Sequence, residues 1–186
     1  REYPEMERPG LPALHTEGLG DALGDKPACG GCGSKIGRST LQNVLKTLPR
    51  PDRPDIVSLP GDDAASLVMG DTRQVISADH LRALTPDPVV VTKIAALHAL
   101  GDIWAMGGVP QSALASIILP RLSTELQERT LSEVMTVAHE VFANAGAAII
   151  GGHSSVGDEM TLGFTVTGLC SRAPISLSGA RPDDQL

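Results

Sequence analysis

The sequence predicts an α+β fold: a ferredoxin-like layer of mainly antiparallel sheet with helices on one face. From residue 64 onward the apolar periodicities follow the order ββαβαββ. Few strands combined with two long helices are typical of helices packed on one side of a sheet. The last strand alternates apolar residues with threonines, so the second face of the sheet also needs a cover. We expect a second copy to bury that face in a homodimer, although a partner domain would serve equally.

The elements of the first half follow from spacing and from terminating residues. Residues 38–48 place leucine and valine at helical intervals before Pro49. Residues 64–69 and 74–78 are short strands, and the four residues between them have the chemistry of a hairpin connection. Pro88 predicts the start of a largely buried helix that reaches Met106 and stops at Gly107-Gly108.

The second half contains a strand, a long helix and two further strands. Residues 111–119 are a strand, and Ser123 caps a helix with one apolar face that is closed by Asn144-Ala145-Gly146. Residues 147–150 form a short apolar strand that runs into a loop at residues 151–154. Residues 160–167 form the last strand.

Composition excludes several classes of function. The 186 residues suit one domain with a tail, and 41% of them are hydrophobic, enough for a core. A net charge of −7 with only 2% aromatic residues argues against nucleic-acid binding. No apolar run approaches the roughly 20 residues that span a bilayer, and no targeting segment opens the chain. We therefore expect a cytoplasmic protein without a membrane contact.

The three cysteines are expected to be reduced thiols. Cys29 and Cys32 form an isolated CxxC pair, and the sequence offers no second ligand pair at the spacing of a structural zinc site. Cys32 lies three residues before Lys35 in a glycine-rich loop. A lysine favours a nearby thiolate and also binds phosphate, so this loop is a candidate anion site. The alternative is a flexible surface loop with an incidental thiol.

Acidic and glycine-rich positions mark the other candidate sites, mostly at the ends of elements. A carboxylate on the buried helix is costly unless it is paired or bound to a cation, and Mg²⁺ is held by one or two carboxylates with waters and phosphate oxygens. The alternatives are turn aspartates at Asp62 and Asp63, a capping or ion-paired Asp102, and a hydrogen-bonding loop histidine at His153. His98, on the buried helix, is interpreted as a core histidine. The positions concerned are Gly61-Asp62-Asp63, Asp79 after the second strand, Asp102, and Gly151-Gly152-His153-Ser154.

Several of these segments occur together in one known family. They are Cys32-Gly33-Ser34-Lys35, Asp62-Asp63-Ala64-Ala65, Ser77-Ala78-Asp79, the run from Ile94 to Gly108, and Gly151-Gly152-His153-Ser154. From about Cys29 to its end, the chain resembles the N-terminal half of selenophosphate synthetase (selenide, water dikinase). The aspartate motif and the helix run are shared with a superfamily that includes aminoimidazole ribonucleotide synthetase and thiamine monophosphate kinase. The Cys-Gly-x-Lys loop narrows the resemblance from this superfamily to selenophosphate synthetase.

The resemblance implies an enzyme that converts ATP, selenide and water to selenophosphate, AMP and orthophosphate. It implies Cys32 and Lys35 as catalytic residues and Asp63 and Asp102 as Mg²⁺ ligands. The ATP contacts it implies are Lys35, Gly61, Asp62, Asp79, Asp102, Gly151, Gly152 and His153. The sequence departs from the family where Ser77-Ala78-Asp79-His80-Leu81 replaces a Thr-Thr-Asp-Phe-Phe stretch, and where His98 replaces an asparagine.

The resemblance also sets the expected domain organisation. Residues 1–26 are rich in proline and glycine and predict a linker or tail, and residues 27–174 form the ATP-binding domain. Residues 175–186 resemble the start of a linker into a C-terminal domain, so we expect this chain to be inactive alone. The alternatives are another ATP-dependent synthetase or kinase of the superfamily, which would not need Cys32, and a non-catalytic dimerisation domain.

Overall fold

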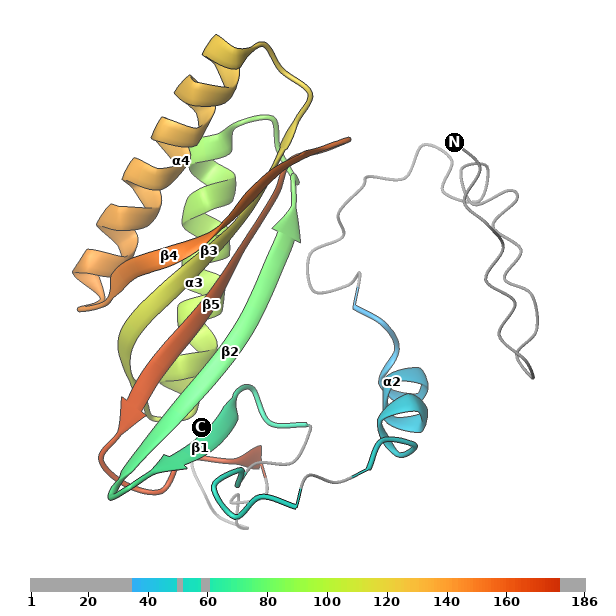
Figure 1. Cartoon of the computed structure of the whole chain (residues 1–186), viewed down its shortest axis with the longest axis vertical. Helices are drawn as coiled ribbons and strands as arrows, with labels where there is room; N and C mark the ends of the chain where they lie inside the picture. The colour runs from blue at the N-terminus through green and yellow to red at the C-terminus, as the bar shows by residue number, and fades with distance from the viewer. Residues whose placement is uncertain (1–34, 50–51, 58–60, 178–186) are drawn as a thin grey trace, which may run out of the picture.

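The computed structural model describes residues 35–49, 52–57 and 61–177. Its helices and strands follow the predicted order (Figure 1). They are α2 (Arg38–Leu45), β1 (Ala65–Met69), β2 (Thr72–Arg82), α3 (Pro88–Ala105), β3 (Val109–Pro120), α4 (Thr124–Asn144), β4 (Ala148–Gly157) and β5 (Thr161–Cys170).

The five strands form one mixed sheet in the order β1-β2-β5-β3-β4. All neighbouring pairs are antiparallel except β3 and β4, which are parallel. Parallel strands need a crossover connection, and α4 supplies it between β3 and β4. The predicted α+β class, with a mainly antiparallel sheet, is confirmed.

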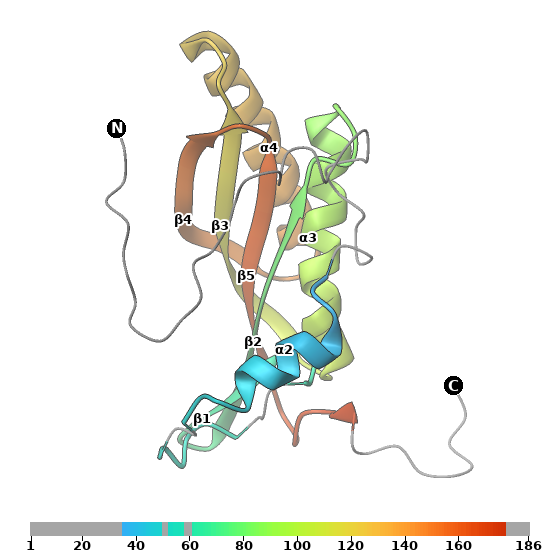
Figure 2. The ribbon, with the colours of Figure 1, turned by 90° about the vertical axis from the view of Figure 1, so that its right-hand side faces the viewer.

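Helices α3 and α4 pack on one face of the sheet and enclose the core (Figure 2). Strand β5 shows the predicted alternation, because Leu162, Phe164 and Val166 are buried while the threonines on its other face are half-buried. The ring of Phe164 packs edge-on against Phe142 of α4 at 5.0 Å between centroids. The core is therefore a single layer between the sheet and two helices.

Helix α3 has clear start and stop signals. Asp87 caps it by accepting hydrogen bonds from the backbone N–H groups of Val89 and Val90, Pro88 follows, and Gly107 ends it with a φ of 71°. Among the described helices, α3 alone has the length and mean hydropathy, 1.2, of a membrane-spanning helix. Core helices of soluble proteins share these properties, and α3 packs against β2, β5 and α4.

Four expected boundaries, in β2, β4 and α2, were wrong. Strand β2 begins at Thr72, so only Gly70 and Asp71 form the hairpin turn, and it continues to Arg82, so Asp79 lies inside the strand. Strand β4 extends to Gly157, so residues 151–154 form strand and not loop. These residues are exposed and lack apolar alternation, and their pairing with β3 holds them in the sheet. Helix α2 ends at Leu45 and buries none of its residues.

The sheet face opposite α3 and α4 carries threonines together with exposed apolar side chains. Leu114 and Ile118 of β3 are 43% and 37% exposed on this face, and Thr165 of β5 lies beside Leu114. None of the described helices packs on it. We call it the open face; it is the surface for which the sequence predicts a cover.

Candidate functional site

Strand β2 and helix α3 each direct two polar side chains into the space between them. Ser77 and Asp79 are two residues apart in β2, so both lie on the face that carries the buried Val75. His98 and Asp102 are four residues apart in α3, so they lie on one face of that helix. The packing of α3 on β2 therefore brings the four side chains together.

Each aspartate of this group is approached by a side chain from the opposite element. The Ser77 hydroxyl donates a hydrogen bond to Asp102 Oδ2 at 2.5 Å. His98 Nε2 lies 3.4 Å from Asp79 Oδ2 without hydrogen-bond alignment. That oxygen is buried and makes no hydrogen bond with any described residue. A buried, unpaired carboxylate oxygen calls for a cation or a donor from a ligand.

A third carboxylate, that of Asp63, acts on the same group from just before β1. Burial raises the pKa of Asp102 above its ordinary value, and the Ser77 hydrogen bond lowers it in part. The charge of Asp79, a hydrogen-bond interaction with the Asp79 carboxyl and the charge of Asp63 raise the pKa of Asp102 further. Like charges disfavour ionisation at close range. The three aspartates predicted from separate parts of the sequence therefore lie within electrostatic reach of one another.

These donors fit a cation that takes few protein ligands. No group of three His, Cys, Asp or Glu side chains with metal-binding geometry exists among the described residues. Mg²⁺ is usually held by one or two carboxylates and completes its shell with waters and phosphate oxygens. The raised pKa of Asp102 and the unpaired oxygen of Asp79 are the features that such an ion would relieve.

The structure describes some, but not all, of the site residues predicted from the N-terminal part of the chain. Gly61 has a φ of 134°, and the Asp62 carboxylate accepts a hydrogen bond at 3.2 Å from the backbone N–H of Leu177. Lys35 is exposed shortly before α2, and no ion pair joins it to another described residue. Cys32, together with Cys29, lies outside the described residues.

The glycine segment of β4 lies away from the carboxylates. Asp79 pairs with Phe164, Phe164 with Ala115, and Ala115 with Gly152, in one row across four strands. At about 4.8 Å per strand, Gly152 is on the order of 14 Å from Asp79 along this row. Sheet packing explains why Gly152 is a glycine, since its φ is 153° and an added Cβ would lie 2.0 Å from the Ala115 carbonyl oxygen. One protomer does not bring Gly151, Gly152 and His153 to the carboxylates.

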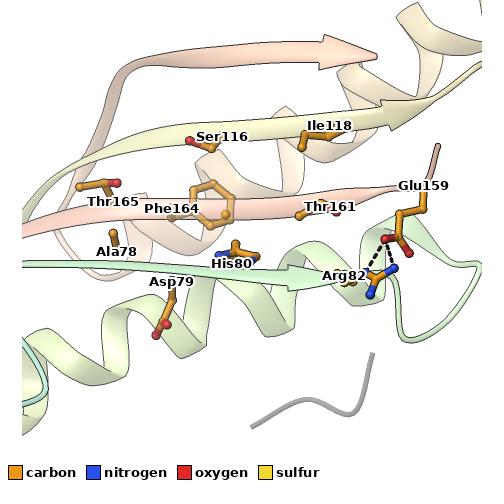
Figure 3. Close-up of a pocket in the computed structure, with 11 residues that line it drawn as sticks. Ala78, Asp79, His80, Arg82, Ser116, Ile118, Glu159, Thr161, Phe164 and Thr165 are labelled. Carbon is orange, nitrogen blue, oxygen red and sulfur yellow. Dashed lines mark hydrogen bonds and ion pairs between the residues drawn. The ribbon is translucent and has the colours of Figure 1, made fainter. Parts of the chain in front are cut away.

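The open face contains a hollow of about 490 Å³, and Asp79 is among the residues that line it. Figure 3 shows its lining by residues of β2, β3 and β5 and by Glu159 of the β4–β5 turn, with the Arg82–Glu159 ion pair at one end. Asp79 belongs to the same stretch of β2, but its carboxylate points toward α3. The candidate site and the hollow therefore lie on opposite faces of the sheet.

The sequence analysis missed two members of the site. Ser77 was noted within the segments compared with the family but was given no role. His98 was interpreted as a core histidine, whereas its side chain is 29% exposed and faces Asp79. Spacing could have found both residues, because Ser77 precedes Asp79 by one strand period and His98 precedes Asp102 by about one helical turn. Polar pairs at these spacings on otherwise apolar faces are the signal.

Two solved structures share the fold. The structure of tt0281 from Thermus thermophilus is 25% identical with a TM-score of 0.63, and it matches 76% of this chain and 46% of that one. The structure of AaThiL complexed with AMPPCP and TMP is 22% identical with a TM-score of 0.64, and it matches 76% of this chain and 44% of that one.

The sequence is similar to a curated protein and matches the model of one protein family. The selenide, water dikinase of Nitratidesulfovibrio vulgaris (strain DSM 19637 / Miyazaki F) is 32% identical over 170 residues, which are 88% of this chain and 48% of the relative. The chain thus spans about half the length of the curated relatives it matches. Residues 61–170, which contain the three aspartates and the whole sheet, match the AIR synthase related protein, N-terminal domain. The chain therefore belongs to the AIR synthase related protein family, of which it contains the N-terminal domain.

Proposed function

We propose that this chain is the ATP-binding N-terminal half of a selenide, water dikinase, which forms selenophosphate, AMP and orthophosphate from ATP, selenide and water. The observation that carries the proposal is the meeting of Asp63, Asp79 and Asp102 between β1, β2 and α3. The 32% identity to a named selenide, water dikinase supports the same activity, and a neighbour of the same fold is complexed with AMPPCP, an analogue of ATP.

The carboxylates have distinct roles in this proposal. Asp63 and Asp102 would hold Mg²⁺, which supplies charge neutralisation at the phosphates. Asp79 would bind and orient the nucleotide complex through its oxygen that makes no hydrogen bond. Gly61 and Asp62 would also contact the nucleotide, as the resemblance implies. Lys35 would add a positive charge at the phosphates, and the Cys32 thiol would receive or guide selenide. These last two roles follow from the resemblance.

The proposal also includes partners and a location. The second half of the relatives' length would complete the cleft, and two copies would pair through their open faces. Within one protomer Gly151, Gly152 and His153 are remote from Asp79, so their proposed contact with ATP rests on the second copy. We place the enzyme in the cytoplasm.

The full-length gene product tests the activity directly. With ATP, Mg²⁺ and selenide, ³¹P NMR should show selenophosphate, orthophosphate and AMP in equal amounts. Asp79→Asn should reduce AMP formation by about two orders of magnitude or more, because it removes the charge that faces the site. Asp71→Asn is the matched control, since Asp71 is exposed in the β1–β2 turn.

Other outcomes point to the alternatives. Release of ADP without a need for selenide, or full selenide-dependent activity in Cys32→Ser, would favour another kinase or synthetase of the superfamily. If the full-length protein showed no Mg²⁺-dependent binding of ATP, the chain would be a non-catalytic dimerisation domain.

A further inference from the structure

Ser77 is a hydroxyl on the apolar, helix-facing side of β2. It is 7% exposed, and Val75 and Leu81 on the same face of the strand are also buried. A buried hydroxyl costs free energy unless it forms a hydrogen bond. Ser77 uses its hydroxyl on the carboxylate of Asp102 and on no other described side chain. The packing of the core therefore does not explain a serine at this position, whereas the contact with Asp102 does.

Asp102 is the carboxylate that most needs to be held in place. It is half-buried on α3 and faces the negative charges of Asp79 and Asp63, which would turn a freely rotating carboxylate away from them. The hydrogen bond from Ser77 fixes Oδ2 against β2 and occupies one lone pair of the carboxylate. An oriented carboxylate loses less entropy when it binds a cation.

We propose that Ser77 is a positioning residue that holds Asp102 in the orientation required for divalent cation binding, and so sets the affinity of the site for the metal. This inference rests on the proposed function, because it takes Asp102 as a metal ligand. In this role Ser77 acts through its hydrogen bond to Asp102. Hydrogen-bond partners of ligating carboxylates commonly change metal affinity by about 10- to 100-fold.

The test measures binding of Mn²⁺, as a stand-in for Mg²⁺, through the EPR signal of the free ion during titration of the full-length protein. Ser77→Ala should raise the dissociation constant for Mn²⁺ by about 10- to 100-fold. Ser77→Thr, which keeps the hydroxyl, should bind as the wild type does. Asp102→Asn should bind far more weakly, which confirms that the titration reports this site.

Ser112→Ala is the matched control for the loss of a serine hydroxyl from the sheet. It removes the 2.7 Å hydrogen bond between Ser112 and Thr167 on the open face, away from Asp102. This variant should keep wild-type affinity for Mn²⁺. If Ser77→Ala fails to fold, Ser77→Thr is compared with Ser77→Val instead. Threonine and valine side chains have nearly the same shape, and only threonine has a hydroxyl.

The inference is overturned if Ser77→Ala binds Mn²⁺ as tightly as the wild type does. If Ser77→Ala does not fold, equal affinities of Ser77→Val and Ser77→Thr for Mn²⁺ overturn it. It is also overturned if Ser112→Ala weakens binding as much as Ser77→Ala, because the effect would then belong to the whole sheet. A wild-type protein that binds no Mn²⁺ removes the metal site and this inference with it. Normal Mn²⁺ binding that depends on Ser77, without AMP formation from ATP and selenide, would instead disprove only the proposed reaction.

Discussion

Asp102 destabilises the cation-free protein while it is charged. Burial and the neighbouring Asp79 and Asp63 raise the pKa of Asp102 in the folded state above its ordinary value of 3.8, despite the opposing hydrogen bond from Ser77. Between these two pKa values the folded chain binds more protons than the unfolded chain does. The contribution of Asp102 to stability is therefore lost as the pH rises through this range, and it is least favourable at neutral pH.

Asp102→Asn should therefore stabilise the protein at pH 7 in the presence of EDTA, because the amide carries no charge. As the pH falls toward 3.8, the wild-type carboxyl becomes neutral and the difference should shrink. Urea unfolding of both proteins at pH 7 and at pH 4 measures it. A difference that is the same at both pH values would show that charge is not its cause.

The sequence predicted the aspartates of the site better than it predicted the side chains that contact them. Asp63 and Asp79 were noted as acids at the ends of expected elements, and Asp102 as a carboxylate on a buried helix that needs a partner. The structure brings the three within electrostatic reach of one another. Ser77 and His98 were missed because neither residue type is costly enough in isolation to require an explanation. Their significance arises from the packing of α3 against β2, and no local pattern records which turn of the helix meets which residue of the strand.

At the scale of elements, the cap of α3 decides how firmly the site's helix is held at its N-terminal end. The Asp87 carboxylate accepts hydrogen bonds from Val89 N–H at 2.9 Å and from Val90 N–H at 3.4 Å. Asp87→Ala should cost about 1 kcal/mol of unfolding free energy, which corresponds to a fall of about 2–4 °C in the melting temperature for a chain of this size. Asp87→Asn, which still accepts these bonds, should recover most of the loss. Equal melting of Asp87→Ala and the wild type would contradict a capping role.

Glycines on the sheet set how closely α3 can approach it. A Cβ added at Gly168 would lie 2.3 Å from Ile103 Cγ2 and 3.1 Å from the Val109 carbonyl oxygen. Ile103 is β-branched and fully buried, so it cannot move aside cheaply. Gly168→Ala should therefore destabilise the protein by about 1–3 kcal/mol in denaturant unfolding.

Gly101→Ala is the matched control on the helix itself. A Cβ there meets nothing within 4 Å, and alanine in a helix interior is favoured over glycine by about 0.5–1 kcal/mol. The same substitution should thus have opposite signs at the two positions. Stabilisation by both variants would mean that the helix–sheet contact at Gly168 is loose.

The strands were harder to delimit than the helices for a physical reason. The helices α3 and α4 have local signals at their ends, Asp87, Ser123, Gly107 and Gly146, and both were predicted to within a residue or two. Strand β4 has no such local signal, because an exposed edge strand needs no apolar alternation and is held by backbone pairing with β3. Gly151-Gly152-His153 was therefore interpreted as a loop, although each of its residues pairs with β3.

At the scale of the whole molecule, the open face is the feature that the described chain leaves unexplained. Its apolar residues, among them Leu114 and Ile118, are about as exposed as outward residues of α3 such as Leu97, at 51%. The sheet face is broad, however, and we propose that it is an interaction site. Two copies that stack their open faces would bury the threonines and the apolar residues together, as expected from the alternation in β5.

The mass of the 186-residue chain in solution tests this proposed homodimer. The wild type should elute in light-scattering chromatography at twice the 19.3 kDa of the chain, and Leu114→Glu should elute near 19.3 kDa. A carboxylate buried without a partner costs about 3–5 kcal/mol, which weakens association by more than two orders of magnitude. Leu97→Glu, on the outward side of α3, is the matched control and should remain dimeric. Dissociation by Leu97→Glu but not by Leu114→Glu would place the interface on the helices and leave the open face for a different partner.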